Sequence, residues 1–179
     1  MADTRWLDEE EQRTWRAYIR MSQLLQEALE RQLQRDSGMP HAYYMILVVL
    51  SESPGRVLTM TGLADLLQYS ASRLSHAISR LEEKGWVRRV KRDGDRRTTM
   101  AELTGEGFAA LAAAAPGHVA EVRRVLFDPL TRAEMHEFRA LLDKIFQGFE
   151  GSGEAVPPAP PASPPPPPAR EDAPADGAG

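Results

Sequence analysis

The chain has 179 residues, of which 42% are hydrophobic, and a net charge of −4 at pH 7. This length allows one domain with a proper core, and the absence of cysteine excludes a disulfide framework, a thiolate zinc site and cysteine-based redox sensing. No uncharged apolar run approaches the roughly 20 residues that span a bilayer. The first residues lead into acidic side chains instead of an apolar signal core, so we expect a cytoplasmic protein without membrane contact.

Two helices are predicted in the first fifty residues. From Asp8 to Arg35, apolar side chains recur every three or four residues, which indicates one long amphipathic helix. Asp8 with Glu11 resembles a capping box, and Ser37-Gly38 supplies a stop. Pro40 opens a nearly all-apolar segment that ends at Ser53-Pro54-Gly55. Its valines and isoleucine also favour strands, but a run of about a dozen residues opened by proline favours a buried helix.

Two short helices are predicted next. After a short extended piece at Arg56 to Leu58, Thr59 caps a brief helix, and Ser70 caps another beyond a turn at Gln68-Tyr69. Two short helices at this spacing form a helix-turn-helix. The inward stripe of the second helix consists of Leu74, Ala77, Ile78 and Leu81.

A β-hairpin is predicted after the second short helix. Trp86 to Lys91 alternates loosely, Asp93-Gly94-Asp95 supplies turn chemistry, and Thr98 to Leu103 is rich in strand-forming residues. A hairpin in this place is the wing of a winged helix. The fold class is therefore expected to be mainly α.

The C-terminal part is predicted to hold two more helices and a tail. Thr104 caps a long alanine-rich helix, in which Pro116-Gly117 predicts a kink or break. Thr131 with Glu134 forms another capping box, which opens a last helix that ends near Phe149. Residues 151–179 hold ten of the fourteen prolines and hardly any large apolar side chain, so we expect a disordered tail.

Positive charge is concentrated between Ser70 and Thr99. This stretch has nine Arg or Lys and four acidic residues, a net charge of +5, which leaves −9 for the rest of the chain. A basic island in an acidic chain is typical of a surface that binds phosphates. The alternative interpretation is a solvated charged helix and hairpin.

The exposed face of the second short helix suits recognition of DNA. Its outward hydroxyl, imidazole and guanidinium groups match phosphate oxygens and base-edge acceptors. We assign direct readout of guanine to Arg73, whereas for Arg80 a phosphate contact or a pair with Glu83 competes with plain solvation. The outward set is Ser70, Ser72, Arg73, Ser75, His76, Ser79 and Arg80.

The hairpin tip concentrates guanidinium groups around two acidic residues. Arg92, Arg96 and Arg97 surround Asp93 and Asp95, and such a loop can enter a narrow, electronegative minor groove. An aspartate two residues before an arginine can hold that arginine in place. The alternative is an ordinary turn with surface ion pairs that contribute roughly 0 to 1 kcal/mol.

The stretch from Leu58 to Gly107 resembles the winged helix of the MarR family of bacterial regulators. The long flanking helices extend the resemblance over about Trp6 to Phe149. The matching motifs are Thr59 with Leu63-Ala64; Ser72-Arg73-Leu74-Ser75 through Ile78, Arg80-Leu81-Glu82 and Gly85; and Asp93-Gly94-Asp95-Arg96-Arg97 followed by Leu103-Thr104 and Gly107.

The resemblance implies a winged helix-turn-helix with long N- and C-terminal dimerisation helices. It assigns residues 1–38 and 105–150 to dimerisation and residues 39–104 to the DNA-binding lobe, with 151–179 as the tail. By the same resemblance, a homodimer places two recognition helices in successive major grooves of a pseudo-palindromic operator. Asp95 would form a wing salt bridge and Arg97 would enter the minor groove. Arg73 departs from the family, many of whose members have a small hydroxyl residue there.

The implied function is sequence-specific transcriptional regulation, with double-stranded DNA and a second copy of the chain as partners. We predict a repressor, and the resemblance adds a pocket where a small aromatic or anionic effector releases DNA. Candidate lining residues also fit a plain apolar core: Trp15, Tyr18, Ile19, Tyr44 and Met45.

Other classes of function find little support in the sequence. The four histidines lack close metal-ligand spacing, and we expect neither a metal site nor a cofactor. No glycine-rich phosphate loop, nucleophile elbow or zinc-hydrolase signature is present, so an enzyme is not expected. The competing hypothesis is a winged helix that binds other proteins without sequence-specific DNA binding.

Overall fold

The computed structural model describes residues 4–92 and 95–151, without the side chains of residues 92, 95, 96 and 150. The segment 152–179, which the sequence predicts to be disordered, lies outside the described residues. The elements in chain order are α1 (Glu9–Ser37), α2 (His41–Glu52), η1 (Pro54–Arg56), β1 (Val57–Thr59), α3 (Met60–Leu67), α4 (Ala71–Glu83), β2 (Val87–Arg92), β3 (Asp95–Leu103), α5 (Gly105–Val122), η2 (Arg123–Phe127) and α6 (Arg132–Gly151).

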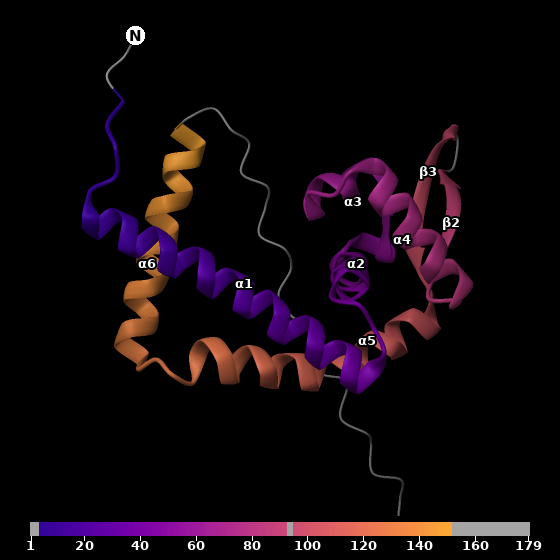
Figure 1. The fold of residues 1–179 in the computed structure, drawn as a ribbon. Coiled ribbons are helices and arrows are strands. Elements are labelled where there is room, and N and C mark those ends of the chain that lie inside the picture. The colour runs from indigo at the N-terminus through magenta and orange to yellow at the C-terminus, as the bar shows by residue number, and fades with distance from the viewer. Residues whose placement is uncertain (1–3, 93–94, 152–179) are drawn as a thin grey trace, which may run out of the picture.

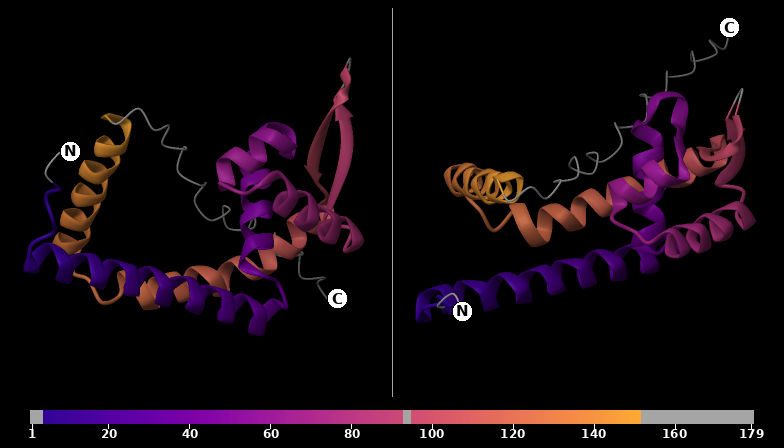
Figure 2. Two further views of the ribbon diagram at one scale, coloured as in Figure 1. Left: turned by 45° about the horizontal axis from the view of Figure 1, so that its top comes forward. Right: turned by 90° about the horizontal axis from the view of Figure 1, so that it is seen from above.

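The described chain has two parts, a frame of long helices and a compact lobe (Figure 1). The frame consists of α1, α5 and α6. The lobe contains α2, α3 and α4, and its β2–β3 hairpin projects away from the frame (Figures 1 and 2). This mainly α architecture with a helix-turn-helix and a wing confirms the predicted fold class. None of the described helices is both long and apolar enough to cross a membrane.

The predicted helix caps are present, which explains where several helices begin. Asp8 accepts a 2.8 Å hydrogen bond from the Glu11 amide, and the Glu11 carboxylate accepts one of 2.9 Å from the Asp8 amide. Thr59, Ser70 and Thr104 each accept a hydrogen bond from an amide in the first turn of their helix. These short-range contacts satisfy amide groups that have no partner inside the helix.

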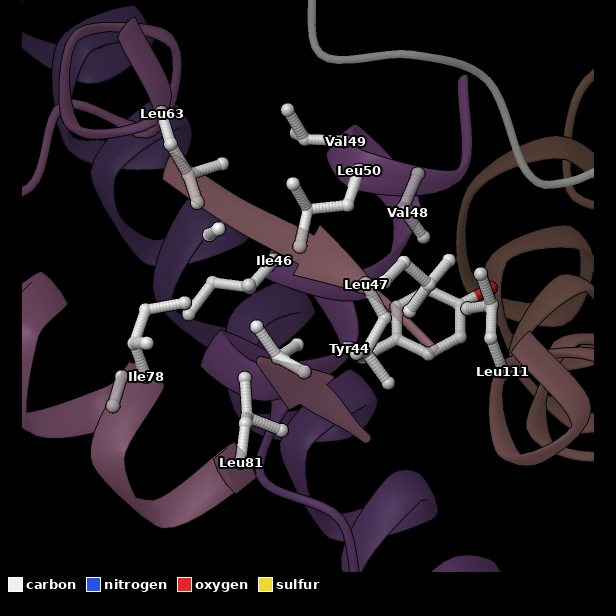
Figure 3. Packing of buried hydrophobic residues seen from close by; sticks show 14 of the residues in the cluster. Tyr44, Ile46, Leu47, Val48, Val49, Leu50, Leu63, Ile78, Leu81 and Leu111 are labelled. Carbon is white, nitrogen blue, oxygen red and sulfur yellow. The ribbon is translucent and has the colours of Figure 1, made fainter. Parts of the chain in front are cut away.

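The core of the lobe is built around α2, as the apolar run predicts (Figure 3). Ile46, Leu47 and Leu50 of α2 are fully buried. The predicted inward stripe of α4 is also buried, so α4 presents its polar face to solvent. Side chains that complete this core from α3, α4 and α5 include Leu63, Leu74, Ile78, Leu81 and Leu111.

The sheet has three strands in the order β1-β3-β2, all antiparallel, so β1 adds a strand to the predicted hairpin. The base of this wing is fixed to α5 by Thr104, whose hydroxyl donates to the Gly85 carbonyl at 2.7 Å. Gly107 permits the close approach of α5. A Cβ atom at this position would lie 2.1 Å from the Trp86 carbonyl oxygen.

The sequence predicts a kink or a break at Pro116-Gly117. The break is wrong, because α5 continues as a helix from Gly105 to Val122, and the kink stays a prediction. Proline costs about 3 kcal/mol inside a helix, but buried side chains on both sides of it, including Leu111 and His118, hold α5 in place. Gly117 lies inside α5 and forms no turn, but its lack of a side chain matters for packing. A Cβ there would lie 2.8 Å from Nε2 at the end of the Gln32 side chain, so the glycine leaves room for this buried side chain of α1 beside α5.

Candidate nucleic-acid interface

The outer face of α4 carries polar side chains at the places that the sequence predicts. Because Leu74, Ala77 and Ile78 are buried, the opposite face of this helix is directed outward. Ser79 is half-buried, and the remaining predicted residues of this face are exposed: Ser70, Ser72, Arg73, Ser75, His76 and Arg80. The helix can therefore offer hydroxyl, imidazole and guanidinium groups to one ligand surface.

Arg73 lies at the N-terminal end of this face and stacks on an aromatic ring. Its guanidinium carbon is 4.1 Å from the centre of the Tyr69 ring. Burial raises the pKa of Tyr69, and the Arg73 charge opposes that shift. Among the described side chains Arg73 has no ion-pair partner, so its charge remains available to an anionic ligand. Stacking leaves the guanidinium edge, where its donors lie, open for hydrogen bonds.

Arg80 forms an ion pair with Glu83, which is one of the alternatives that the sequence leaves open. Its Nη1 lies 2.8 Å from Glu83 Oε2, three residues further along α4. The hydrogen bond from Arg80 to Glu83 and the charge of Glu83 raise the pKa of Arg80 further above its ordinary value. Pairing at this exposed site is weak, so Arg80 can still contact a phosphate if the pair opens.

Arg88 and Lys91 of β2 are bound across the hairpin. Arg88 donates two hydrogen bonds to Glu102, at 2.8 and 2.7 Å, and these hydrogen bonds lower the pKa of Glu102. Lys91 Nζ donates to Thr99 Oγ1 at 2.9 Å. Both contacts hold β2 against β3, and the sequence signal that could have found them is the alternation of side chains on paired strands.

Arg89 joins the hairpin to α4, a role that the sequence interpretation missed. Its guanidinium forms an ion pair with Glu82 and donates to the Ser75 carbonyl at 2.9 Å. The Arg89 amide also donates to Glu82 Oε1 at 2.8 Å. The available signal was an acidic residue seven positions before an arginine, with a glycine turn between them.

The tip of the wing lies partly outside the described residues. Neither Asp93 nor Gly94 is described, and the side chains of Arg92, Asp95 and Arg96 are not described either. The predicted bridge from Asp95 therefore stays a prediction. Arg97 is exposed on β3, close to the tip.

The five predicted pocket residues are not brought together. Trp15 and Tyr18 stack on each other on α1, with ring centres 6.0 Å apart. They are 54% and 53% exposed, and Ile19 on the same helix is 36% exposed. Tyr44 is buried in the lobe, 4.3 Å from the ring of His118. Only Met45 of this set lines a cavity of about 670 Å³ between α1, α2 and the α3–α4 turn, where it is joined by Tyr69 and Arg73.

A buried histidine lies where α1, α2 and α5 meet. His118 is 7% exposed, and its ring centre lies 5.7 Å from that of His41. Burial, reinforced by the charge of His41, lowers the pKa of His118 to about 4. The His118 ring is therefore neutral at physiological pH. Among the described residues, no group of three or more potential ligands could hold a metal ion.

Comparisons with known proteins agree with this architecture. Residues 37–98 match the model of the MarR family. The chain is 28% identical over 126 residues to the transcriptional regulator PecS of Dickeya dadantii, covering 70% of this chain and 75% of PecS.

Two solved structures from Streptomyces coelicolor are more similar. AbsC, a MarR family transcriptional regulator, is 40% identical with a TM-score of 0.76, over 83% of this chain and 99% of AbsC. Sco3205, a MarR family transcriptional regulator solved in complex with DNA, is 46% identical with a TM-score of 0.79, over 88% of this chain and 98% of Sco3205. On this similarity, which extends through both the lobe and the long helices, the chain belongs to the MarR family of transcriptional regulators.

Proposed function

We propose that the chain is a repressor that binds a pseudo-palindromic operator as a homodimer. The observation that carries this proposal is the polar outer face of α4 beside the hairpin, in a chain 46% identical to a regulator that was solved with DNA. An exposed helix of this kind fits the major groove, and a neighbouring hairpin reaches the minor groove. No described feature of the lobe indicates a different ligand for this face.

Within the interface, α4 reads the bases and the wing holds the backbone. Arg73 can donate two hydrogen bonds to one guanine, a contact that contributes roughly 1 to 3 kcal/mol of discrimination. Ser72, Ser75 and His76 provide further hydrogen-bonding groups on the same exposed face. Phosphate or minor-groove contacts are assigned to Ser70, Arg92, Arg96 and Arg97, and to Arg80 when its pair with Glu83 opens. Asp95 is assigned to the wing salt bridge that positions an arginine.

The frame is the proposed dimer interface, from residues 1–38 and 105–150. Although α6 crosses α1 in Figure 1, the two helices lie apart in the right-hand view of Figure 2. Apolar side chains on α6 are therefore left exposed, among them Leu141, Ile145 and Phe146. Large exposed apolar faces are typical of protein interfaces, and a second copy would cover them with its own frame.

The cavity beside Arg73 is the proposed effector site, in place of the pocket residues expected from the sequence. It lies between the frame and the lobe, so a bound molecule would contact both parts. Arg73 and Tyr69 supply a cation and an aromatic ring, which suit a small aromatic molecule. Glu27 and Glu30 also line this cavity, so an acidic group of the ligand would have to lie beside Arg73 or Arg31. Such a ligand would hold Arg73 away from DNA and weaken operator binding.

Salt dependence of DNA binding distinguishes this function from a winged helix that binds only proteins. Fragments recovered from genomic DNA supply a candidate operator, and fluorescence anisotropy gives its Kd at several salt concentrations. A DNA-binding lobe must lose affinity steeply with salt, by a slope of about 0.9 per neutralised phosphate on logarithmic axes. Absent or salt-independent binding would support the protein-binding alternative.

Variants locate the contact surface, and a reporter tests repression. Arg97→Ala is expected to weaken binding to every duplex, whereas Arg13→Ala, which removes an exposed charge from the frame, should not. Equal effects of the two variants would place the DNA elsewhere. A reporter gene behind the recovered operator is expected to be more active without the protein, and a decrease would indicate an activator.

A further inference from the structure

Arg89 connects the two elements that would contact DNA. It belongs to β2, but its guanidinium reaches α4. Nη1 pairs with Glu82, while Nη2 lies 2.9 Å from the Ser75 carbonyl oxygen and 3.2 Å from Ser79 Oγ. These acceptors lie in the middle and the last turn of the recognition helix, so one side chain is attached at several points along α4.

The Arg89 side chain is partly buried, whereas that of its neighbour Arg88 is exposed. The side chains of Arg89 and Glu82 are each 30% exposed, whereas that of Arg88 is 65% exposed and pairs with Glu102 inside the sheet. A partly buried pair is less screened than a surface pair, and a guanidinium fork fixes both distance and direction. The pair with Glu82 can therefore set how α4 is rotated against β2.

Arg89 also affects a hydroxyl that faces DNA. Nη2 lies 3.4 Å from Ser75 Oγ, which accepts from it and keeps its own proton for another acceptor. Ser75 is thereby prepared to donate to a phosphate or base oxygen. Because this guanidinium is engaged within the lobe, it is not itself directed toward a phosphate.

We propose that Arg89 is a positioning residue that holds the recognition helix and the wing in the relative geometry that an operator requires. The inference rests on the proposed function, because it assumes that α4 and the wing contact the same DNA. A helix in the major groove and a hairpin in the minor groove must fit at the same time, so a loose connection would reduce specific binding more than non-specific binding.

The test compares Arg89→Gln with the matched control Arg88→Gln, in the full-length chain. Anisotropy gives Kd for the recovered operator and for a scrambled duplex of equal length, at several salt concentrations, and thermal unfolding is followed in parallel. Arg89→Gln is expected to lower the ratio of specific to non-specific affinity about tenfold, the equivalent of one base contact, with the salt slope unchanged. Arg88→Gln is expected to leave the ratio unchanged.

Further variants keep the test decisive. Glu82→Gln removes the same pair from α4 and should reproduce the effect, even if Arg89→Gln does not fold. Arg89→Lys keeps the charge without the two-pronged guanidinium group and should not restore the ratio of specific to non-specific affinity.

Two results would overturn the proposal. A salt slope reduced by about 0.9, with both duplexes bound equally less tightly, would make Arg89 a phosphate contact. The other result is an unchanged ratio in both Arg89→Gln and Glu82→Gln. If the unaltered protein binds no duplex at all, the proposed function itself fails.

Discussion

Replacing Gly107 with alanine is expected to destabilise the junction between α5 and the wing. The added Cβ would lie 2.1 Å from the Trp86 carbonyl oxygen and 2.8 Å from Leu103 Cδ1. Normal contacts of this kind exceed about 3 Å, so the start of α5 must move by roughly 1 Å. The clash is with backbone, which cannot rotate away. Overpacking of this kind costs roughly 1–3 kcal/mol, which corresponds to a fall in Tm of roughly 3–10 °C.

Gly105→Ala is the matched control, because it adds the same methyl group two residues earlier in α5. A Cβ at Gly105 meets nothing within 4 Å, so its effect on the free energy of unfolding should stay within about 1 kcal/mol. Urea and thermal unfolding of both variants, at equal protein concentration, provide the comparison. Equal midpoints for the two variants would refute the argument that close backbone approach requires glycine at position 107.

Three further predictions concern DNA reading, assembly and pH. Arg73→Ala should weaken operator binding and relax the preference at one base pair by roughly 1–3 kcal/mol, and a uniform loss across all single-base variants would remove its base-reading role. Phe146→Glu should shift the protein toward monomer in analytical ultracentrifugation, since it places a charge on the exposed apolar face of α6. For His118, the folded pKa of about 4 is below the unfolded value of 6.5, so the unfolded state binds more protons and stability falls as the pH is lowered from 6.5 to 4. His118→Gln should lose part of this pH dependence of Tm, and an unchanged profile would assign acid sensitivity to other groups.

Features that depend on neighbouring residues could be predicted from the sequence. The Asp8–Glu11 capping box and the caps at Thr59, Ser70 and Thr104 are present because each involves residues about three positions apart. The apolar stripe of α4 followed from helical periodicity in the same way. Local chemistry therefore located both helices of the helix-turn-helix before any tertiary information was used.

Features that depend on distant residues could not be predicted. The proline signal at Pro116 was outweighed by packing on both sides of it, and the use of Gly117 depends on Gln32, which lies on another helix. The short extended piece at Arg56 to Leu58 gave no indication that β1 pairs with β3. The predicted pocket residues do not lie together. Helical periodicity shows which face of α1 is apolar, but it does not show which part of α1 packs against the lobe.

The basic island illustrates the same limit, with a measurable consequence. If all nine basic side chains between Ser70 and Thr99 met phosphates, the salt slope would be about 8 for each lobe, at about 0.9 per contact. Arg88 and Arg89 are instead paired with carboxylates of the lobe. Opening such a pair on DNA would leave its carboxylate beside the phosphates, so we expect at most about seven contacts and a slope of no more than about 6 for each lobe. A much steeper slope would mean that these pairs open on DNA, and the wing and recognition helix would then lose the link through Arg89 that holds them together.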